Sequence, residues 1–169
     1  SNSAWSNLST GAYCVYDDDE DNADTYGYLY NWYAVGTGNL APEGWHVPTD
    51  AEWMELEMAL GMSENEANDT GYRGTDQGSQ LAGNADLWNN EDLVNNANFG
   101  TSGFNALPGG YRVYSYGYYN GMGDRGYFWS FTEYGSSNAW YRILIFSSSG
   151  VYRYSNSKRT GFTVRLVRD

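Results

Sequence analysis

The clearest periodic pattern of apolar residues in the chain predicts a helix that begins after Thr49. Thr49 and Glu52 have the spacing of a capping box, in which each side chain accepts a hydrogen bond from the other residue's backbone N–H. Gly61 is the residue type that commonly ends a helix. Between these signals, apolar residues recur at helical spacing: Trp53, Leu56, Met58, Ala59 and Leu60. A second, shorter helix is predicted over 63–68.

Two aromatic or apolar segments precede this helix. Residues 12–16 are apolar enough for a short strand, and residues 26–35 (YGYLYNWYAV) predict a strand or a short helix buried on at least one face. Gly, Pro and Asn then mark residues 36–44 as a loop. Residues 69–110 are rich in Gly, Asn and Asp and contain only isolated apolar anchors, so we expect a long, mostly irregular region there.

The last third of the chain predicts strands. A β-rich region is expected to begin at 110–119, and residues 148–150 are expected to form a hairpin turn. Four further strand candidates share a pattern of apolar and aromatic residues: 126–132, 139–147, 150–154 and 161–167. The order of elements predicts an α+β fold, with a small, mostly antiparallel sheet, one or two helices and long irregular loops.

Side-chain alternation separates the two faces of these strands. If Val151 points inward, Tyr152 and Tyr154 lie on the opposite face and Arg153 shares the side of Val151. The strand at 139–147 must twist or bulge, because its apolar residues do not keep one phase. We expect five apolar side chains in the core: Trp129, Trp140, Phe162, Val164 and Leu166.

Length and composition limit the class of protein. The 169 residues are enough for one domain over 1–169 with its own core, and we expect residues 1–11 to be a linker or an expression remnant. No apolar run approaches the ~20 residues that a membrane span requires, so no membrane insertion of this domain is expected. The chain has one cysteine, Cys14, and one histidine, His46. An internal disulfide and metal sites built from several cysteines or histidines are therefore excluded.

Charge is distributed unevenly along the chain. Residues 1–100 hold 18 acids and one basic residue, a net of −17, whereas residues 101–169 hold eight basic residues and three acids, a net of +5. The total of −12 argues against sequence-independent nucleic-acid binding, which requires a basic face. We expect the eight basic residues to lie on solvated strand faces.

The acidic run DDDEDNAD at 17–24 predicts a solvated loop. Asp17, Asp19 and Asp21 have the early spacing of a calcium-binding loop, but the glycine and the glutamate that such a loop needs further on are missing. A solvated loop is favoured, and calcium is the alternative. No other cofactor is expected.

Five segments together resemble the Fibrobacter succinogenes major paralogous domain. They are YGYLYNWYAV (26–35), GWHVPTDAEWMEL (44–56), NALPGGYR (105–112), GYFWSFTEY (126–134) and GFTVRLVRD (161–169). The resemblance extends over most of the chain and implies a C-type-lectin-like fold. It also implies kinship with the formylglycine-generating enzyme, whose helix and final strand resemble VPTDAEW and GFTVR.

The chain does not carry the residues of the enzymes it resembles. The formylglycine-generating enzyme holds copper with a pair of cysteines near its C-terminal end, and residues 15–169 contain no cysteine. Related iron-dependent sulfoxide synthases use three histidines, whereas His46 is expected to be packed or hydrogen-bonded. Asp124 and Glu133 lie in separate segments, and Glu133 is expected to bond a backbone group or an arginine. We therefore expect no enzyme, no catalytic residue and no metal site.

The C-terminal 60 residues are crowded with Tyr, Ser, Asn and Gly, which is the composition of antibody-like binding surfaces. The alternative is that the rings simply cover a sheet, because aromatic residues favour strands. We predict thirteen ligand-binding residues: Tyr114, Tyr116, Tyr118, Tyr119, Asn120, Ser136, Ser137, Asn138, Tyr141, Tyr152, Tyr154, Asn156 and Arg159. Tyr152, Tyr154 and Asn156 are expected to share an exposed surface with the 114–120 loop.

The resemblance gives this surface a context. C-type-lectin-like domains of this type include the hypervariable receptors of diversity-generating retroelements, whose variable positions lie in a C-terminal stretch. Residues 136–159 are rich in the Tyr, Ser and Asn that mutagenesis of asparagine codons produces. The resemblance implies a non-enzymatic recognition domain, extracellular or on a cell or virion surface, that binds a protein of another cell or host. A carbohydrate-binding adhesin is the alternative, although the EPN or QPD and WND strings of calcium-type lectins are missing.

Overall fold

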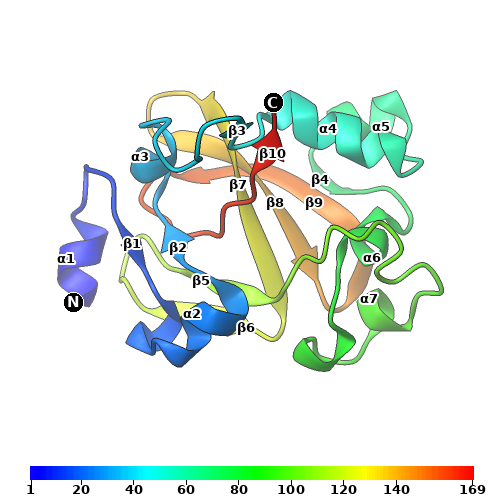
Figure 1. Ribbon diagram of the computed structural model, residues 1–169, viewed down its shortest axis with the longest axis horizontal. Helices are drawn as coiled ribbons and strands as arrows, with labels where there is room; N and C mark the ends of the chain where they lie inside the picture. The colour runs from blue at the N-terminus through cyan, green and yellow to red at the C-terminus, as the bar shows by residue number, and fades with distance from the viewer.

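A six-stranded sheet forms the centre of the computed structural model, which describes residues 1–169 (Figure 1). Its strands are β4 (Gly71–Arg73), β5 (Gly109–Arg112), β6 (Tyr119–Met122), β7 (Arg125–Tyr134), β8 (Asn138–Ile145) and β9 (Ser148–Ser157). They lie in the order β4-β9-β8-β7-β5-β6, and every neighbouring pair is antiparallel except β5 and β7. The fold class is α+β, as the sequence predicts.

Two small strand pairs lie outside this sheet. The first joins β1 (Tyr13–Cys14) to β2 (Leu29–Tyr30), and the second joins β3 (Trp45–His46) to β10 (Val167–Arg168). Both pairs are antiparallel. The second pair brings the last residues of the chain beside the segment that enters α4, so the C-terminus lies near the start of this helix (Figure 1).

Seven α-helices and two 3₁₀ turns surround the sheet, and only α4 is longer than six residues. They are α1 (Asn2–Ser6), η1 (Tyr16–Asp18), α2 (Asp21–Tyr26), α3 (Trp32–Val35), α4 (Asp50–Ala59), α5 (Glu64–Asn68), α6 (Gln77–Leu81), η2 (Ala85–Leu87) and α7 (Asp92–Asn95). The sequence predicted one or two helices, because the short ones carry too few residues for a periodic signal.

The capping box predicted at the start of α4 is present. The Glu52 backbone N–H donates to Thr49 Oγ1 at 3.2 Å, and the Thr49 N–H donates to Glu52 Oε2 at 2.8 Å. The predicted second helix, α5, begins with the same arrangement between Ser63 and Glu66. Both helices therefore satisfy N-terminal donors with their own side chains.

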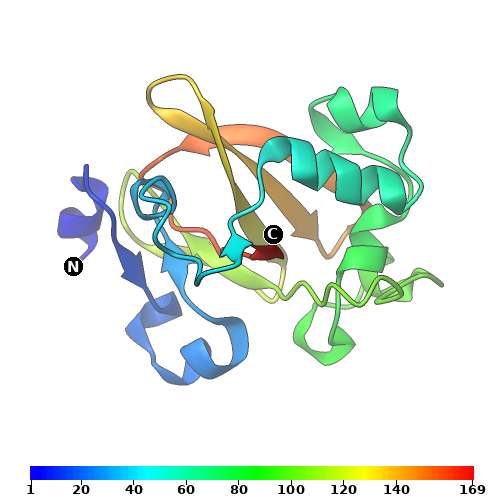
Figure 2. The ribbon, with the colours of Figure 1, turned by 45° about the horizontal axis from the view of Figure 1, so that its top comes forward.

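The core has two parts, one on each face of the sheet. On one face, α4, α6 and α7 cover a cluster that includes Trp53, Phe128 and Leu144. On the other face, α3 and the segment after β9 cover a cluster that includes Trp129 and Phe162. The figures show these two groups on opposite sides of β7, β8 and β9 (Figures 1 and 2). Trp129 and Phe162 are fully buried, as predicted.

Several sequence predictions need correction at the C-terminal end. Residues 161–167 form no continuous strand, because Gly161, Phe162 and Thr163 each bridge a different neighbour, in β5, β2 and β7. Leu166 is 37% exposed and so lies outside the core. Trp140 is only half-buried, and its ring lies under the Arg153 guanidinium, 4.0 Å from centroid to Cζ.

The predicted turn at 148–150 is also wrong. Ser148 pairs with Ile145, so the turn is at 146–147 and residues 148–150 belong to β9. Gly150 is needed for another reason, because a Cβ on it would lie 2.7 Å from the Arg73 carbonyl oxygen of β4. A Cβ on Gly78 of α6 would in turn overlap the carbonyl group of Gly150, so this helix also approaches β9 closely. The two glycines therefore allow close packing, which a turn signal cannot distinguish.

Three N-terminal and central segments are more ordered than predicted. Residues 17–24 include η1 and the start of α2, although the run is largely exposed. Residues 1–11 are not a linker, because α1 places Trp5 in the interior at 3% exposure with its ring against Arg112. Residues 69–110 contain β4, α6, η2 and α7, while residues 26–35 form both β2 and α3.

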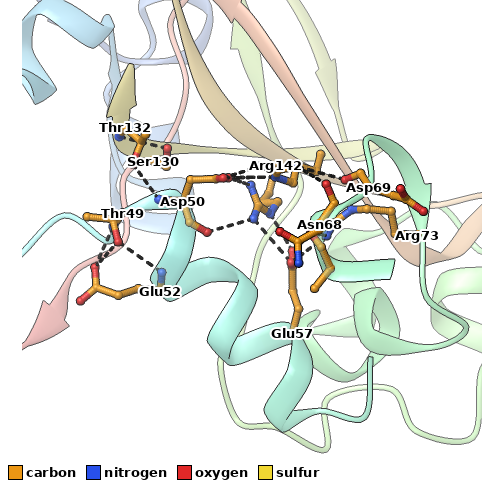
Figure 3. A network of polar contacts seen from close by, with 12 residues as sticks. Thr49, Asp50, Glu52, Glu57, Asn68, Asp69, Arg73, Ser130, Thr132 and Arg142 are labelled. Atoms are coloured by element: carbon orange, nitrogen blue, oxygen red, sulfur yellow. Dashed lines mark hydrogen bonds and ion pairs between the residues drawn. The ribbon is translucent and has the colours of Figure 1, made fainter. Parts of the chain in front are cut away.

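Five basic residues are buried, which overturns the prediction that those on the strands are solvated. They are Arg73, Arg112, Arg142, Arg153 and Lys158. Arg142 Nε donates to Glu57 Oε1 and its Nη1 donates to Asp50 Oδ1, each at 2.6 Å. Figure 3 shows Arg142 reaching from the sheet toward both acids of α4.

The same two acids are shared with other arginines. Arg153 Nη2 donates to Asp50 Oδ2 at 2.6 Å, and Arg73 forms two hydrogen bonds with Glu57 at 2.8 and 2.9 Å. Burial alone would raise the pKa of Asp50, but the hydrogen bonds and charges of Arg153 and Arg142 outweigh it and hold that pKa below its ordinary value. We call these five residues (Asp50, Glu57, Arg73, Arg142 and Arg153) the buried ion network.

Candidate ligand-binding face

One face of the central sheet carries a row of aromatic side chains whose centre is buried under α3 and Phe162 and whose outer rings are exposed. The strand register places these side chains on the face opposite α4, across β4, β5, β7, β8 and β9. We call this surface the tyrosine face, and its residues are Tyr72, Tyr111, Arg125, Tyr127, Tyr141, Ile143, Tyr152 and Tyr154.

Strand pairing fixes the order of the residues on the tyrosine face. Tyr72 pairs with Tyr152, Tyr152 pairs with Ile143, and Ile143 pairs with Tyr127. One row therefore crosses four strands. Tyr154 lies beside this row, in the register that the alternation of β9 predicts. The predicted separation of Tyr152 and Tyr154 from Val151 and Arg153 is confirmed, since both of the latter are buried on the α4 side.

The rings form a continuous series of aromatic contacts. Centroid distances are 4.9 Å from Tyr72 to Tyr152, 6.4 Å from Tyr152 to Tyr141, 6.2 Å from Tyr141 to Tyr127, and 4.6 Å from Tyr127 to Tyr111. Phe162 lies 4.8 Å from Tyr127 and 4.9 Å from Tyr141. The buried Phe162 ring thus holds the central tyrosines in place, and the outer rings pack on them.

Exposure rises from the centre of the tyrosine face to its edge. Tyr127 and Tyr141 are buried at 5% and 6%, while Tyr72 and Tyr154 are exposed at 58% and 50%. Tyr152, between these groups, is half-buried. A graded surface of this kind combines immobile central rings with outer rings that a partner can cover.

The hydroxyl groups of this face are largely free. Tyr127 alone among its tyrosines forms a hydrogen bond within the chain, accepting from Arg125 Nη1 at 3.4 Å. No tyrosine hydroxyl is among the buried atoms that lack a partner. Burial raises the pKa of Tyr141, and the phenols of Tyr152 and Tyr127 raise it further, so this hydroxyl stays protonated. Neutral phenols that reach solvent can both donate and accept hydrogen bonds to a ligand.

The structure divides the thirteen predicted binding residues into three groups. The sheet group consists of Tyr141, Tyr152, Tyr154 and Asn156, with Asn120 beside Tyr111 at the edge of the sheet. Asn156 pairs with Ala139, so it shares the side of Tyr152 and Tyr154, as predicted. Tyr141 is a correction, because its ring is in the core and only its hydroxyl end can contribute to an open surface.

The second group belongs to the 114–120 loop. The rings of Tyr116 and Tyr118 stack 5.8 Å apart at 12° and are exposed at 68% and 47%. Arg159 lies over Tyr114, 5.6 Å from centroid to Cζ. No aromatic contact joins Tyr116 or Tyr118 to Tyr152 or Tyr154. Tyr116 and Tyr118 therefore form an aromatic pair of their own, and a single binding surface that joins this loop to Tyr152 and Tyr154 stays a prediction.

Tyr119 has a structural role within this loop. Its hydroxyl donates to Asp18 Oδ1 at 2.7 Å, and its ring lies 4.7 Å from the Arg112 Cζ. These contacts tie β6 to the acidic segment. Tyr119 is consequently engaged by the chain itself, unlike the exposed rings of Tyr116 and Tyr118.

The third group, Ser136, Ser137 and Asn138, lies at the hairpin between β7 and β8. The two serines are exposed, and their carbonyl groups accept from the Lys158 side chain and backbone, at 3.1 and 2.9 Å. Lys158 Nζ also lies 3.0 Å from Glu133 Oε1, so Glu133 bonds a lysine and not the backbone group or arginine that the sequence predicted. This hairpin is held in shape by Lys158, and its exposed aromatic side chain is Tyr134, whose ring packs on Trp140 with 4.8 Å between the ring centroids.

The sequence did not single out Tyr72, Arg125 or Ile143 as site residues. Tyr72 lies in the segment predicted to be irregular, and β4 can be recognised as a strand only from its pairing with β9 in the structure. Arg125 stands at the first residue of β7, where alternation gives no information on its own. Tyr127 lies two residues further along the same strand, so its side chain is expected on the same face as that of Arg125.

The residues considered for catalysis are used by the fold. His46 Nδ1 lies 2.6 Å from Asp169 Oδ1 and its Nε2 lies 2.7 Å from Glu52 Oε1, which confirms a hydrogen-bonded histidine. Burial raises the pKa of the Cys14 thiol, which opposes formation of a nucleophilic thiolate. No three His, Cys, Asp or Glu side chains come together as a metal-binding group.

The largest cavity, of about 630 Å³, lies elsewhere, between α4 and residues 165–168. Trp53, Leu56 and Phe104 line it, together with the mixed charges of Glu55 and Arg165. None of the four main cavities includes a residue of the tyrosine face. The tyrosine face is therefore an open surface and not a pocket.

Comparison with protein families gives one result that covers nearly the whole chain. The sequence description of the Fibrobacter succinogenes major domain matches residues 2–168. The chain belongs to the Fibrobacter succinogenes major domain family. No curated protein and no solved structure matches the sequence. This membership confirms the resemblance seen in the five sequence segments.

Family membership extends from α1 to β10 in this Fibrobacter succinogenes major domain. It therefore includes Trp5 near one end and the β3–β10 pair near the other. None of its helices has the length and hydrophobicity that crossing a bilayer requires.

Proposed function

We propose that this Fibrobacter succinogenes major domain is a non-enzymatic recognition module that binds a protein ligand through the tyrosine face. The observation that carries the proposal is the row of packed tyrosines whose outer members are exposed and whose hydroxyls, apart from that of Tyr127, form no intramolecular hydrogen bond. Sheet faces of folded domains are ordinarily covered by helices or lined with polar side chains, and an exposed aromatic patch indicates an interaction site.

The packing of the face favours binding. Tyrosine gives a large contact area with few rotatable bonds, so little conformational entropy is lost when it is covered. The rings from Tyr111 to Tyr72 already support one another in the free protein. A ligand would meet a surface that needs little rearrangement.

The absence of a pocket at this face favours a macromolecular ligand. Small-molecule sites are concave and enclose most of the ligand, whereas protein interfaces are broader and flatter. The tyrosine face crosses five strands and lies outside the main cavities. This extent across the sheet, without a pocket, favours a protein ligand over a small molecule.

A non-enzymatic role agrees with how the chain uses its reactive side chains. Asp50 and Glu57 are neutralised by three arginines within the buried ion network, and His46 bridges two carboxylates. Cys14 is held as a thiol. No nucleophile with an adjacent base lies at an open surface of the kind that covalent catalysis requires.

The wider context follows from the sequence resemblance. We propose a C-type-lectin-like fold for the α+β domain, with display outside the cell or on a cell or virion surface. The stretch 136–159 includes β8 and β9 and therefore supplies Tyr141, Tyr152 and Tyr154 to the tyrosine face. Retroelement-driven diversification of the surface positions in this stretch would vary the ligand surface. Arg142 and Arg153 lie in the same stretch and would have to stay constant to keep the buried ion network. A near-repeat of the 3′ coding end beside a reverse transcriptase gene would test that part of the proposal.

Carbohydrate binding is the second candidate, and a different feature favours it. The parallel, exposed rings of Tyr116 and Tyr118 offer flat apolar surfaces on which a sugar ring can stack. Loss of glycan-array binding in a Tyr116→Ala/Tyr118→Ala variant, with tyrosine-face variants unaffected, would support this candidate.

The main proposal is tested by selecting binders from a displayed library of random peptides on the immobilised domain. We expect binders whose affinity falls at least tenfold in a Tyr72→Ala/Tyr154→Ala variant. Both side chains are half-exposed or more, so the free energy of unfolding should change by only about 1 kcal/mol. Tyr13→Ala is the matched control, because Tyr13 is 66% exposed on the separate β1–β2 pair. Binders that do not respond to the double variant would contradict the proposal.

A further inference from the structure

Arg125 is the one charged residue of the tyrosine face, and no carboxylate pairs with it. Arg125 is half-buried at the start of β7, and its side chain forms one hydrogen bond, which Nη1 donates to the Tyr127 hydroxyl. The nearest acid in sequence, Asp124, instead accepts a hydrogen bond from the side chain of Asn89. Arg125 therefore presents a guanidinium whose charge no acid in the chain neutralises.

This lack of a partner is unusual among the basic residues of the chain. Five of the nine pair with acids: Arg73, Arg112, Arg142, Arg153 and Lys158. Arg159 and Arg165 instead bond backbone carbonyl groups. Arg125 and Arg168 remain, and Arg168 lies on the exposed β10 strand away from the tyrosine face. In a chain with 21 acids, Arg125 alone is an unpaired cation within an aromatic surface.

Phenols surround this guanidinium. The hydrogen bond with Tyr127 raises the pKa of Arg125, and the phenols of Tyr111 and Tyr72 add to the effect while partial burial opposes it. Gly121 lies beside the aliphatic part of Arg125 and the Tyr111 ring, since a Cβ there would be in van der Waals contact with both, at 3.7 and 3.8 Å. The hydrogen bond to Tyr127 thus holds the guanidinium in position, and its other N–H groups donate to no acceptor within the chain.

We propose that the tyrosine face recognises an acidic protein segment, with Arg125 binding an Asp or Glu carboxylate of the ligand and neighbouring phenol hydroxyls donating to the same group. This inference rests on the proposed function. A guanidinium matches a carboxylate with two parallel hydrogen bonds, and phenols supply additional neutral donors. Apolar and aromatic side chains on either side of the acid would cover Ile143 and the outer rings.

The chemistry of the face selects against other ligands. A cationic segment would meet an uncompensated positive charge, and like charges at an interface are strongly disfavoured. A purely apolar segment would remove water from Arg125 without replacing its hydrogen bonds. An acidic residue of the ligand would neutralise the charge of Arg125 and would replace the hydrogen bonds that Arg125 loses with water. The lack of a pocket at this face favours a protein segment over a free anion.

The test uses the peptides selected on the wild-type domain. One binder that depends on Tyr72 and Tyr154 is synthesised in its parent form and with its acidic residue replaced by the amide. Affinities are measured by calorimetry for the wild type, Arg125→Gln, Arg125→Lys and the control Arg168→Gln. Melting curves establish that each variant is folded.

We expect selected peptides to be enriched in Asp or Glu relative to the input library. The amide replacement should weaken binding to the wild type and to Arg168→Gln by about tenfold, as for a partly desolvated charge pair. In Arg125→Gln the two peptides should bind equally, and Arg125→Lys should lie between, because it keeps the charge but loses the planar fork.

The possible failures are distinguishable. Binders that require Tyr72 and Tyr154 but show no acidic enrichment, or keep their affinity in Arg125→Gln, would overturn this inference and leave the proposed function standing. Absence of any binder that depends on the tyrosine face would overturn both. A glycan that binds the tyrosine face in place of peptides would also overturn the inference, because the ligand would belong to another class.

Discussion

Arg142 shows how single residues of this domain combine charge with a buried position. It is fully buried in β8, yet its guanidinium bonds Asp50 and Glu57 of α4. Removing charges from water is costly, and the cost is offset only when each group finds partners of good geometry. Here two acids and three arginines share one network, so each charge has an opposite charge beside it.

Glu57→Ala tests this network. The substitution leaves Arg73 without its ionic partner and removes one of the two from Arg142, both in the interior. We expect the free energy of unfolding to fall by about 3–5 kcal/mol, measured by chemical denaturation. Glu55→Ala on the same helix is the control, because Glu55 is exposed and forms no ion pair; its effect should stay within about 0.5 kcal/mol. Equal, small effects of both substitutions would contradict the account.

Trp129→Ala tests the core beneath the tyrosine face. Trp129 is fully buried, lies 4.4 Å from Phe162 between ring centroids, and donates from Nε1 to the Tyr30 carbonyl at 2.9 Å. Its loss should lower the free energy of unfolding by about 3–5 kcal/mol. Trp45→Ala, at a side chain 44% exposed, should change it much less. A small effect of Trp129→Ala would show that this core does not support the sheet.

At the residue scale, the sequence predicted local relations better than distant ones. The alternation of β9 was enough to place Tyr152 and Tyr154 together, because neighbours in a strand obey a period of two. The burial of Arg142 and Arg153 was not predictable in that way. Their partner Asp50 lies about a hundred residues away along the chain, and an arginine in a strand ordinarily points to solvent.

At the scale of elements, the β3–β10 pair depends on one titratable side chain. His46 of β3 bonds Asp169 just after β10 and Glu52 of α4. Hydrogen bonds with Asp169 and then with Glu52 raise the pKa of His46. Because the folded-state pKa is raised, the stabilisation is fully present below the unfolded pKa of about 6.5 and is lost as pH rises through the folded value.

His46→Gln tests this pH dependence. Glutamine retains hydrogen bonding but carries no charge. The difference in unfolding free energy between wild type and His46→Gln should be largest near pH 6 and shrink as pH rises above 6.5. Denaturant titrations between pH 6 and 9 measure it. A difference that stays constant over this range would contradict a charged His46 at this junction.

Element prediction succeeded where local signals were strong. The capping box of α4 identified that helix from the sequence, because its side chains satisfy backbone groups within one turn. The helix α5 was also predicted, and the structure shows a second capping box at its start. Helices α6 and α7 gave no such signal, because four or five residues are too few to be stable alone. They form because the sheet and each other supply the contacts, such as the bond from Ser79 Oγ to the Leu93 carbonyl at 2.8 Å.

At the scale of the whole molecule, the uneven charge has a structural meaning. The acidic first hundred residues and the basic last sixty-nine meet at the interface between α4 and the sheet, where Asp50 and Glu57 receive Arg142 and Arg153. The asymmetry in sequence is therefore partly an internal complementarity. In the folded chain most of the basic residues form ion pairs with acids, whereas Arg125 has no acidic partner and lies at the surface.

The two faces of the sheet differ in what covers them. The buried ion network and α4, α6 and α7 lie on one face, and the tyrosine face lies on the other, where α3 and Phe162 cover its centre and leave its outer rings exposed. The sequence predicted the C-terminal strands as the binding region, and these strands supply Tyr141, Tyr152 and Tyr154 to the tyrosine face. It also joined them to the 114–120 loop, but composition alone does not show how two segments that are both rich in tyrosine lie relative to each other.

Hydroxyl-radical footprinting of the domain, alone and with a selected peptide, tests the central claim most directly, because oxidation reports the exposure of individual tyrosine side chains. We expect Tyr72 and Tyr154 to become protected when the peptide is bound, while Tyr13 and Tyr116 keep their free-state oxidation. Protection of Tyr116 and Tyr118, with Tyr72 and Tyr154 unchanged, would contradict a binding role for the tyrosine face.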